Sequence, residues 1–312
     1  MSDKKSSDNL LLCWLTAMRI PFTTVALAPF AVGFVWALSA GIKVSWTMGM
    51  LGEIAVFSIC VCCHMFGEIF DQVEDRKTLV YGRSKFAGGT LMIAEGHIQP
   101  LHAGIAAILF LGLAFICGLI ITIYYKSLIL FGLGAFGAIT AVLYSVPPLR
   151  LVRRGVGELF IGICYGWLTL TTGFATASGF LPSNSFLMSL PIAFSVFNII
   201  LINEFPDFQA DMEAGKKNLM IRIGKESAAK VYGIVNLFII ISFLIICITL
   251  HPETYLYLLM IVPASMMALI ISFNLIFLKK WQKLDQLEKF CGMTIILNHI
   301  CSITLALLFI CR

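Results

Sequence analysis

Long apolar stretches alternate with short polar ones along the whole chain. A membrane-spanning helix needs about 20 apolar residues, and nine segments are long enough. They cover residues 20–40, 46–68, 101–124, 127–145, 157–178, 185–206, 228–250, 254–278 and 291–311. Residues 1–19 are predicted to form a cytoplasmic and interfacial N-terminal segment. We therefore expect an all-α membrane protein with nine transmembrane helices, in a single membrane domain over residues 1–312.

Composition and charge support this prediction and suggest an orientation. The 312 residues are 59% hydrophobic and only 12% charged, which no soluble core of this size would bury. Cytoplasmic loops of membrane proteins carry an excess of Lys and Arg. With the N-terminus in the cytoplasm, all of the 22 Lys and Arg except Lys43, Lys126 and Arg312 fall on the cytoplasmic side. The net charge of +5 thus follows from membrane topology and indicates no nucleic-acid partner.

Two acidic stretches, after the second and sixth predicted spans, look like copies of one another. The first runs from Gly67 to Asp75 and the second from Asn203 to Asp211, and they align without a gap. Both contain the pattern E-x-x-D-x-x-x-D. If the stretches are helical, this spacing places the three carboxylates on one face. The repeat predicts two four-helix halves plus a ninth helix, with both acidic stretches on the cytoplasmic face.

The acidic stretches are predicted to hold divalent cations and, through them, a polyanion. Mg²⁺ prefers carboxylates and phosphate oxygens as ligands, and cationic side chains would take the remaining negative charge of a diphosphate. The positive-inside rule explains the same basic residues without any ligand, so both explanations stay open. The basic residues predicted to bind diphosphate are Lys85, Arg150, Lys216, Lys217 and Arg222.

Three stretches carry a resemblance to a known family. They are Gly67-Glu68-x-x-Asp71-x-x-x-Asp75, the run from Asp207 through Asp211 to Gly224, and the connection from Tyr144 to Glu158. On these stretches the chain resembles the UbiA-type intramembrane prenyltransferases, most closely those that prenylate quinone precursors. That family has a nine-helix fold with N-D-x-x-D-x-x-x-D after its second helix and D-x-x-x-D after its sixth. Its first Asn-Asp is Gly67-Glu68 here, whereas Asn203 occupies the matching place in the second copy.

The resemblance implies an enzyme that transfers an isoprenyl group, with Mg²⁺, from an allylic (poly)prenyl diphosphate to an aromatic acceptor such as 1,4-dihydroxy-2-naphthoate. It implies a multi-pass protein of the cell inner membrane, with the active site facing the cytoplasm. The sequence itself indicates no oligomeric state. The implied catalytic residues are Asp71, Asp75, Asp207 and Asp211, and the implied Mg²⁺ ligands are these four with Glu68 and Asn203.

Other acceptors and other functions stay open at this point. The acceptor is also compatible with 4-hydroxybenzoate, a haem or chlorin, or geranylgeranylglyceryl phosphate. A membrane transporter would also show parallel repeats, but it would place acids or broken helices near the bilayer midplane. A CDP-alcohol phosphotransferase would show D-G-x-x-A-R, whereas Asp71 is followed by Gln72-Val73.

Overall fold

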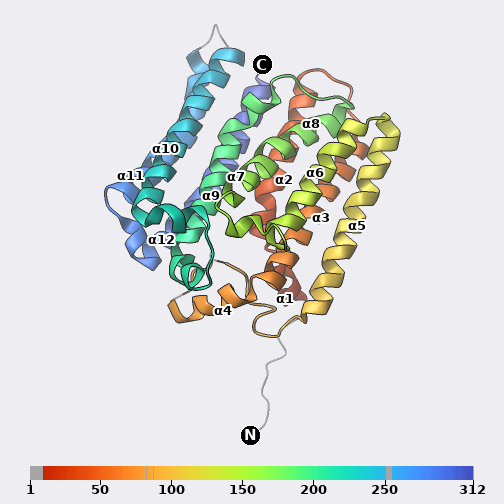
Figure 1. Ribbon diagram of the computed structural model, residues 1–312. Helices are drawn as coiled ribbons and strands as arrows, with labels where there is room; N and C mark the ends of the chain where they lie inside the picture. The colour runs from red at the N-terminus through yellow and green to blue at the C-terminus, as the bar shows by residue number, and fades with distance from the viewer. Residues whose placement is uncertain (1–9, 82, 87, 251–254, 312) are drawn as a thin grey trace.

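The computed structural model describes residues 10–81, 83–86, 88–250 and 255–311, and within these ranges it contains helices and no strand (Figure 1). A π-helical turn, Ile163–Leu168, joins α7 (Gly157–Gly162) to α8 (Thr169–Ser178), so that the three form one continuous span. Short 3-10 helices cover Leu151–Arg153, Tyr255–Ile261 and Lys280–Gln282. The α-helices are α1 (Leu10–Ala17), α2 (Ile20–Ser39), α3 (Trp46–Phe70), α4 (Gln72–Tyr81), α5 (Pro100–Tyr125), α6 (Leu128–Ser145), α7 (Gly157–Gly162), α8 (Thr169–Ser178), α9 (Ser185–Glu213), α10 (Leu219–Leu250), α11 (Val262–Ile276) and α12 (Leu284–Ile310).

Nine helical segments of the described ranges are long and apolar enough to cross a membrane, which confirms the predicted number. Some helices are longer than hydropathy predicts. Helix α9 continues past residue 206 to Glu213, and α10 begins at Leu219 instead of residue 228, with a kink at Gly224, whose φ of 78° and ψ of 158° are not helical. Pro206 lies inside α9 without ending it, because a proline removes only one backbone donor and neighbouring groups tolerate it in membrane helices. Hydropathy marks where apolar residues stop, and the helices extend beyond that point.

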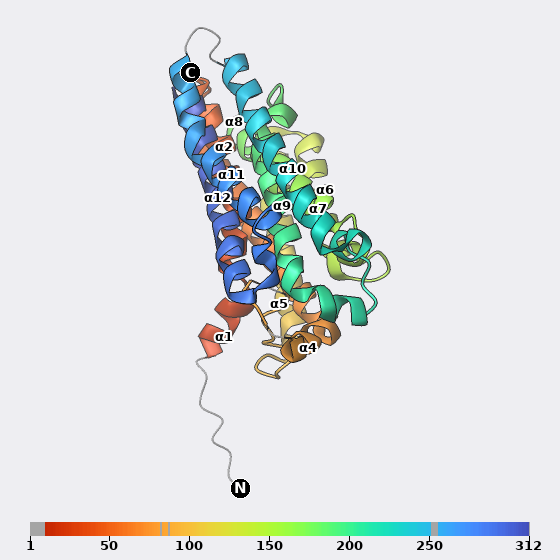
Figure 2. The ribbon, with the colours of Figure 1, turned by 90° about the vertical axis from the view of Figure 1, so that its left-hand side faces the viewer.

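The nine spans form two groups of four that are joined by the ninth. Helix α3 packs against α5 and α6 in the first group, and α9 packs against α10 in the second. The groups meet where α2 packs against α8, and α12 packs against both α2 and α9 (Figures 1 and 2). A Cβ atom on Gly33 of α2 would lie 2.0 Å from the carbonyl oxygen of Leu170 in α8. Glycine thus permits the close helix approach that membrane interfaces favour.

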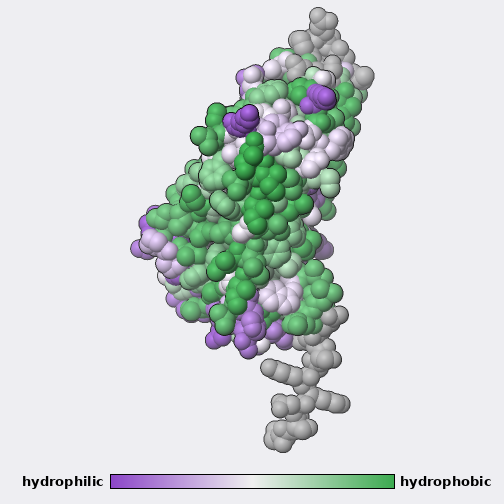
Figure 3. Space-filling model, turned by 90° about the vertical axis from the view of Figure 1, so that its right-hand side faces the viewer, coloured by the Kyte–Doolittle hydropathy of each residue, from purple (hydrophilic) through white to green (hydrophobic). Residues whose placement is uncertain are grey.

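The surface of the bundle suits a lipid environment. Figure 3 shows a hydrophobic belt between hydrophilic residues at the two ends. On α5 the exposed side chains include Ile108, Leu109 and Ile123. These hydrophobic side chains would be unfavourable in water and suit contact with lipid. The predicted N-terminal interfacial segment contains α1, whose leucines are exposed while Cys13 and Ala17 are buried. Helices α1 and α4 lie at one end of the bundle (Figure 2), and the assignment of that end to the cytoplasm stays a prediction.

Candidate active site

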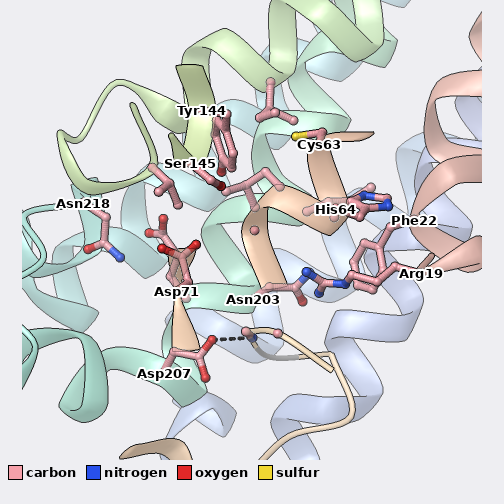
Figure 4. A pocket seen from close by; sticks show the side chains of 18 of the residues that line it. Arg19, Phe22, Cys63, His64, Asp71, Tyr144, Ser145, Asn203, Asp207 and Asn218 are labelled. Carbon is pink, nitrogen blue, oxygen red and sulfur yellow. Dashed lines mark hydrogen bonds between the residues drawn. The ribbon is translucent and has the colours of Figure 1, made fainter. Parts of the chain in front are cut away.

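A cavity of about 170 Å³ lies between the two acidic stretches. Figure 4 shows side chains pointing into it from several helices, with Asp71 and Asp207 reaching it from opposite acidic stretches. Most of its remaining wall is apolar, so the acids lie at the polar end of a mainly hydrophobic cavity. All six residues that the resemblance implies as metal ligands line this cavity: Glu68, Asp71 and Asp75 from the first stretch, and Asn203, Asp207 and Asp211 from the second.

The first acidic stretch is bent instead of forming one helix. Helix α3 ends at Phe70, and Asp71 has non-helical dihedral angles of φ −104° and ψ 12° before α4 begins. The Arg150 guanidinium stabilises this bend by donating to the Phe70 carbonyl oxygen at 2.8 Å and to Asp71 Oδ1 at 2.7 Å. The expected single helical face therefore holds for the second stretch, which lies within α9, but is wrong for the first. The three acids still line one cavity, because the bend turns Asp75 toward it.

Three consecutive backbone N–H groups of the loop before α5 bind acids of both stretches. Gly88 donates to Asp207 Oδ2 at 2.6 Å, and Gly89 donates to Asp75 Oδ1 at 2.8 Å. Thr90 donates to Glu68 Oε1. A Cβ atom on Gly89 would lie 1.9 Å from Asp75 Oδ2, so this close approach requires glycine. The loop compensates part of the buried negative charge without adding a cation.

In the second stretch the loop binds Asp207, whereas side chains bind Asp211. Lys216 Nζ lies 2.9 Å from Asp211 Oδ1, and Asn218 Nδ2 donates to Asp211 Oδ2 at 3.1 Å. Burial alone would lower the pKa of Lys216, but the carboxylates of Asp211 and Asp71 raise it above its ordinary value. Lys216 is therefore a buried cation that keeps its charge beside the cavity.

Electrostatics at the cavity favour a further cation. Burial raises the pKa of Asp75 to about 7, and the nearby Glu68 carboxylate adds to this rise while the Gly89 N–H opposes it. Acids outnumber the lining cations, which are Arg19 and Lys216. A positive charge close to such a carboxyl group stabilises its ionised form.

Comparison with known proteins decides what class this site belongs to. The sequence model of the UbiA prenyltransferase family matches residues 26–295. The chain belongs to the UbiA prenyltransferase family. This confirms the predicted resemblance and places the chain in a family of prenyl-transferring enzymes.

Individual relatives are more distant. The chain is 30% identical over 106 residues to UbiA prenyltransferase domain-containing protein 1 of Dictyostelium discoideum, a match covering 34% of this chain and 32% of that protein. It therefore spans about a third of that relative's length. It is 28% identical over 228 residues to 1,4-dihydroxy-2-naphthoate octaprenyltransferase of Bacillus subtilis, covering 72% of this chain and 70% of that protein. A UbiA homologue of Archaeoglobus fulgidus, solved with DMAPP and Mg²⁺ bound, shares the fold with a TM-score of 0.63 at 19% identity, covering 93% of this chain and 98% of that chain.

The predicted diphosphate-binding residues of this UbiA family member divide into two groups. Lys216 lines the cavity, and Arg150 contacts Asp71 from outside the lining. Lys85, Lys217 and Arg222 are not among the lining residues. Arg222 instead donates to the carbonyl oxygens of Lys217 and Arg154, at 2.7 and 3.0 Å. These three residues lie outside the cavity lining, and their role at the diphosphate stays a prediction.

Sequence reasoning missed two cavity residues at the connection between α1 and α2. Arg19 lies between α1 and α2 in a left-handed conformation with φ 52°, and its side chain reaches into the cavity (Figure 4). Such a conformation is uncommon for residues other than glycine and is often found at functional sites. His64 of α3 also lines the cavity, and its Nδ1 lies 2.8 Å from the carbonyl oxygen of Met18. The available signal was an arginine immediately before the first predicted span.

Proposed function

We propose that this protein transfers a prenyl group from an allylic diphosphate to an aromatic quinone precursor, on the cytoplasmic side of a membrane. The observation that carries the proposal is the single cavity on which both acidic stretches converge, with Arg19 and Lys216 beside them. Membership of the UbiA family supports the reaction type. The Bacillus subtilis relative, named for octaprenyl transfer to 1,4-dihydroxy-2-naphthoate, supports the choice of acceptor.

Mg²⁺ fits the residues of this cavity. Asn203 Oδ1 and Asp207 Oδ1 are buried and have no hydrogen-bond partner among the described residues. Mg²⁺ is commonly bound through one or two carboxylates together with phosphate oxygens of the substrate. The residues that would hold the ions are Glu68, Asp71, Asp75, Asn203, Asp207 and Asp211. The Archaeoglobus fulgidus homologue, solved with DMAPP and Mg²⁺, supports this choice.

The chain's own residues contribute binding, charge stabilisation and exclusion of water. Bound Mg²⁺ supplies positive charge that neutralises the diphosphate. Lys216 and Arg19 are placed to stabilise the negative charge that grows on the diphosphate as the C–O bond breaks with its electron pair. An electron-rich ring carbon of the acceptor then forms the new C–C bond to the allylic carbon, with diphosphate as the leaving group. The same ring carbon loses its own substituent, either a proton or a carboxyl group as CO₂, and the ring becomes aromatic again. Apolar wall residues such as Phe22, Val25 and Ile199 exclude water that would otherwise capture the allylic cation.

A product assay tests the proposal. The purified protein in lipid nanodiscs is incubated with Mg²⁺, geranylgeranyl diphosphate and one acceptor at a time, and products are identified by mass spectrometry. The acceptor panel contains dihydroxynaphthoate, 4-hydroxybenzoate, homogentisate, a haem and geranylgeranylglyceryl phosphate. We expect a prenylated product with dihydroxynaphthoate that disappears when EDTA is added. Product with only the glyceryl phosphate would overturn the aromatic acceptor, and no product with any acceptor would overturn prenyl transfer itself.

A further inference from the structure

Three cavities follow one another between α3, α6 and the span that contains α7, the π-helical turn and α8. The acidic cavity shares Cys63, Ile161 and Tyr165 with a small cavity of about 50 Å³. The small cavity in turn adjoins a larger one of about 320 Å³. A row of adjacent cavities with shared wall residues therefore leads from the carboxylates along α3 toward Gly52, and we refer to this row as the path. The residues that line both the small and the larger cavity are Val56, Ile59, Gly137 and Leu168.

The larger cavity is suited to a hydrocarbon chain. Its lining residues, all within the described ranges, are apolar except for Thr172 and Thr176. Both threonine hydroxyls donate to carbonyl oxygens of their own helix, at 2.8 Å to Leu168 and 2.8 Å to Thr172. The wall thus offers no free donor to a polar ligand. Because the path begins at the proposed diphosphate site, the occupant that fits is the isoprenoid tail of the donor.

The path is narrow where the small and larger cavities meet. Gly137 of α6 faces Leu168, the last residue of the π-helical turn. A Cβ atom on Gly137 would lie 3.0 Å from Leu168 Cδ2, which is closer than carbon atoms normally approach. Any side chain at residue 137 would therefore enter the passage or displace Leu168. π-helical turns inside α-helices occur frequently at functional sites, and here the turn supplies one side of the constriction.

The position of the constriction relates it to the length of the tail. Gly137 precedes Ser145, which lines the acidic cavity, on the same helix, and eight residues of α-helix correspond to about 12 Å. The larger cavity continues along α3 as far as Gly52, which lies about 24 Å along the helix from Glu68 at 1.5 Å per residue. A geranyl tail ends near the constriction, whereas farnesyl and geranylgeranyl tails must pass it.

We propose that the contact between Gly137 and Leu168 determines which donor tails this protein accepts, and that glycine at residue 137 admits tails longer than geranyl into the larger cavity. This inference rests on the proposed function, because it assigns the path to the donor. It adds a specificity-determining pair that lies outside the lining of the acidic cavity.

The test compares donors of increasing length on matched variants. The kcat/KM values for dimethylallyl, geranyl, farnesyl and geranylgeranyl diphosphate are measured with Mg²⁺ and dihydroxynaphthoate for the natural protein, Gly137→Leu and Gly132→Leu. Gly132 is the matched control, because it lies on the same helix, does not line the cavities, and has no atom within 4 Å of a built Cβ. We expect Gly137→Leu to lower kcat/KM for geranylgeranyl relative to geranyl diphosphate by roughly tenfold or more, whereas Gly132→Leu keeps the natural ratio.

A second pair of variants guards against misfolding of Gly137→Leu. Gly137→Ala should show a smaller loss in the same direction, and adding Leu168→Ala should restore use of the long donors by reopening the passage. An unchanged ratio in both Gly137 variants would overturn the inference while leaving prenyl transfer intact. Equal losses for all four donors would also overturn it. Absence of transfer by the natural protein with every donor would instead refute the proposed function, and the inference with it.

Discussion

The two acidic stretches share a sequence pattern but are held in different ways. The second lies within the unbroken helix α9, whereas the first bends at Asp71 between α3 and α4. Arg150 and the N–H groups of Gly89 and Thr90 bind the first stretch. The second stretch is bound at Asp207 by the Gly88 N–H and at Asp211 by the side chains of Lys216 and Asn218. The repeated pattern therefore predicts which carboxylates meet, but not the backbone that carries them. Two unlike supports produce one cavity.

The largest expected effect comes from removing one carboxylate charge from either stretch. Asp71→Asn and Asp207→Asn should each lower kcat/KM by about 100-fold or more, because each removes a proposed ligand facing the shared cavity. An asparagine at 207 can still accept the Gly88 N–H, so the fold should be kept. Steady-state kinetics at saturating Mg²⁺ and circular dichroism measure the two effects.

The control for these variants is Asp285→Asn, an exposed acid at the start of α12. Its kinetics should equal those of the natural protein. If Asp207→Asn keeps the kcat/KM of the natural protein, the proposal that both stretches are needed is wrong. The second stretch would then have a structural role only.

The next effect tests the cation that supports the second stretch. Lys216→Gln leaves Asp211 buried without its partner at 2.9 Å, so we expect a loss of stability of about 3 kcal/mol together with a large fall in kcat. Lys217→Gln provides the matched control, since the neighbouring lysine does not line the cavity. Thermal unfolding measures the stability of both variants, and steady-state kinetics measure their kcat. Equal stability and equal kcat in the two variants would contradict this prediction.

A smaller effect is expected from loosening the bend of the first stretch. Arg150→Met removes the donor to the Phe70 carbonyl oxygen and to Asp71, which should cost about 1–3 kcal/mol of stability and reduce kcat less than Asp71→Asn does. Arg154→Met, which loses bonds only to nearby carbonyl oxygens in an exposed turn, is the control. If Arg150→Met abolishes turnover as completely as Asp71→Asn, Arg150 itself acts on the substrate.

The smallest effect concerns the position where the two stretches differ. A Cβ atom on Gly67 would meet only Ser145 Oγ, at 3.7 Å, so Gly67→Asn has room to place an amide as Asn203 does. We expect a lower Mg²⁺ concentration for half-maximal activity, with up to about 0.5–1 kcal/mol of added stability from removing a helical glycine. Mg²⁺ titrations at saturating donor and acceptor measure this. A rise in acceptor KM without a gain in Mg²⁺ affinity would show that Gly67 borders the acceptor instead.

The sequence was sufficient for the features that depend on one strong physical signal. Nine spans follow from the cost of exposing backbone and polar groups to lipid, and the repeated acids identify the facing groups Asp71 and Asp207. It was insufficient where the geometry depends on tertiary contacts. The bend at Asp71 depends on Arg150, which is distant in sequence. The left-handed conformation that lets Arg19 reach the cavity has no local signature.

Basic residues were the weakest sequence signal for the site. Membrane topology enriches Lys and Arg at one end of the bundle regardless of any ligand, so Lys85, Lys217 and Arg222 looked the same as Lys216. Only the structure separates them, by burial and by contact with Asp211. The series of apolar cavities was equally invisible, because every membrane helix is rich in the residues that line it.

The central claim is that both acidic stretches form one binding site, and a double-mutant cycle on donor binding tests it most directly. Isothermal titration calorimetry would measure the Kd of an unreactive geranylgeranyl thiolodiphosphate, with and without Mg²⁺, for the natural protein, Asp71→Asn, Asp207→Asn and the double variant. For one shared site, the double variant should bind little more weakly than either single variant, which corresponds to a coupling energy of about 1 kcal/mol or more. Losses that add independently, or binding unaffected by Mg²⁺, would contradict the claim.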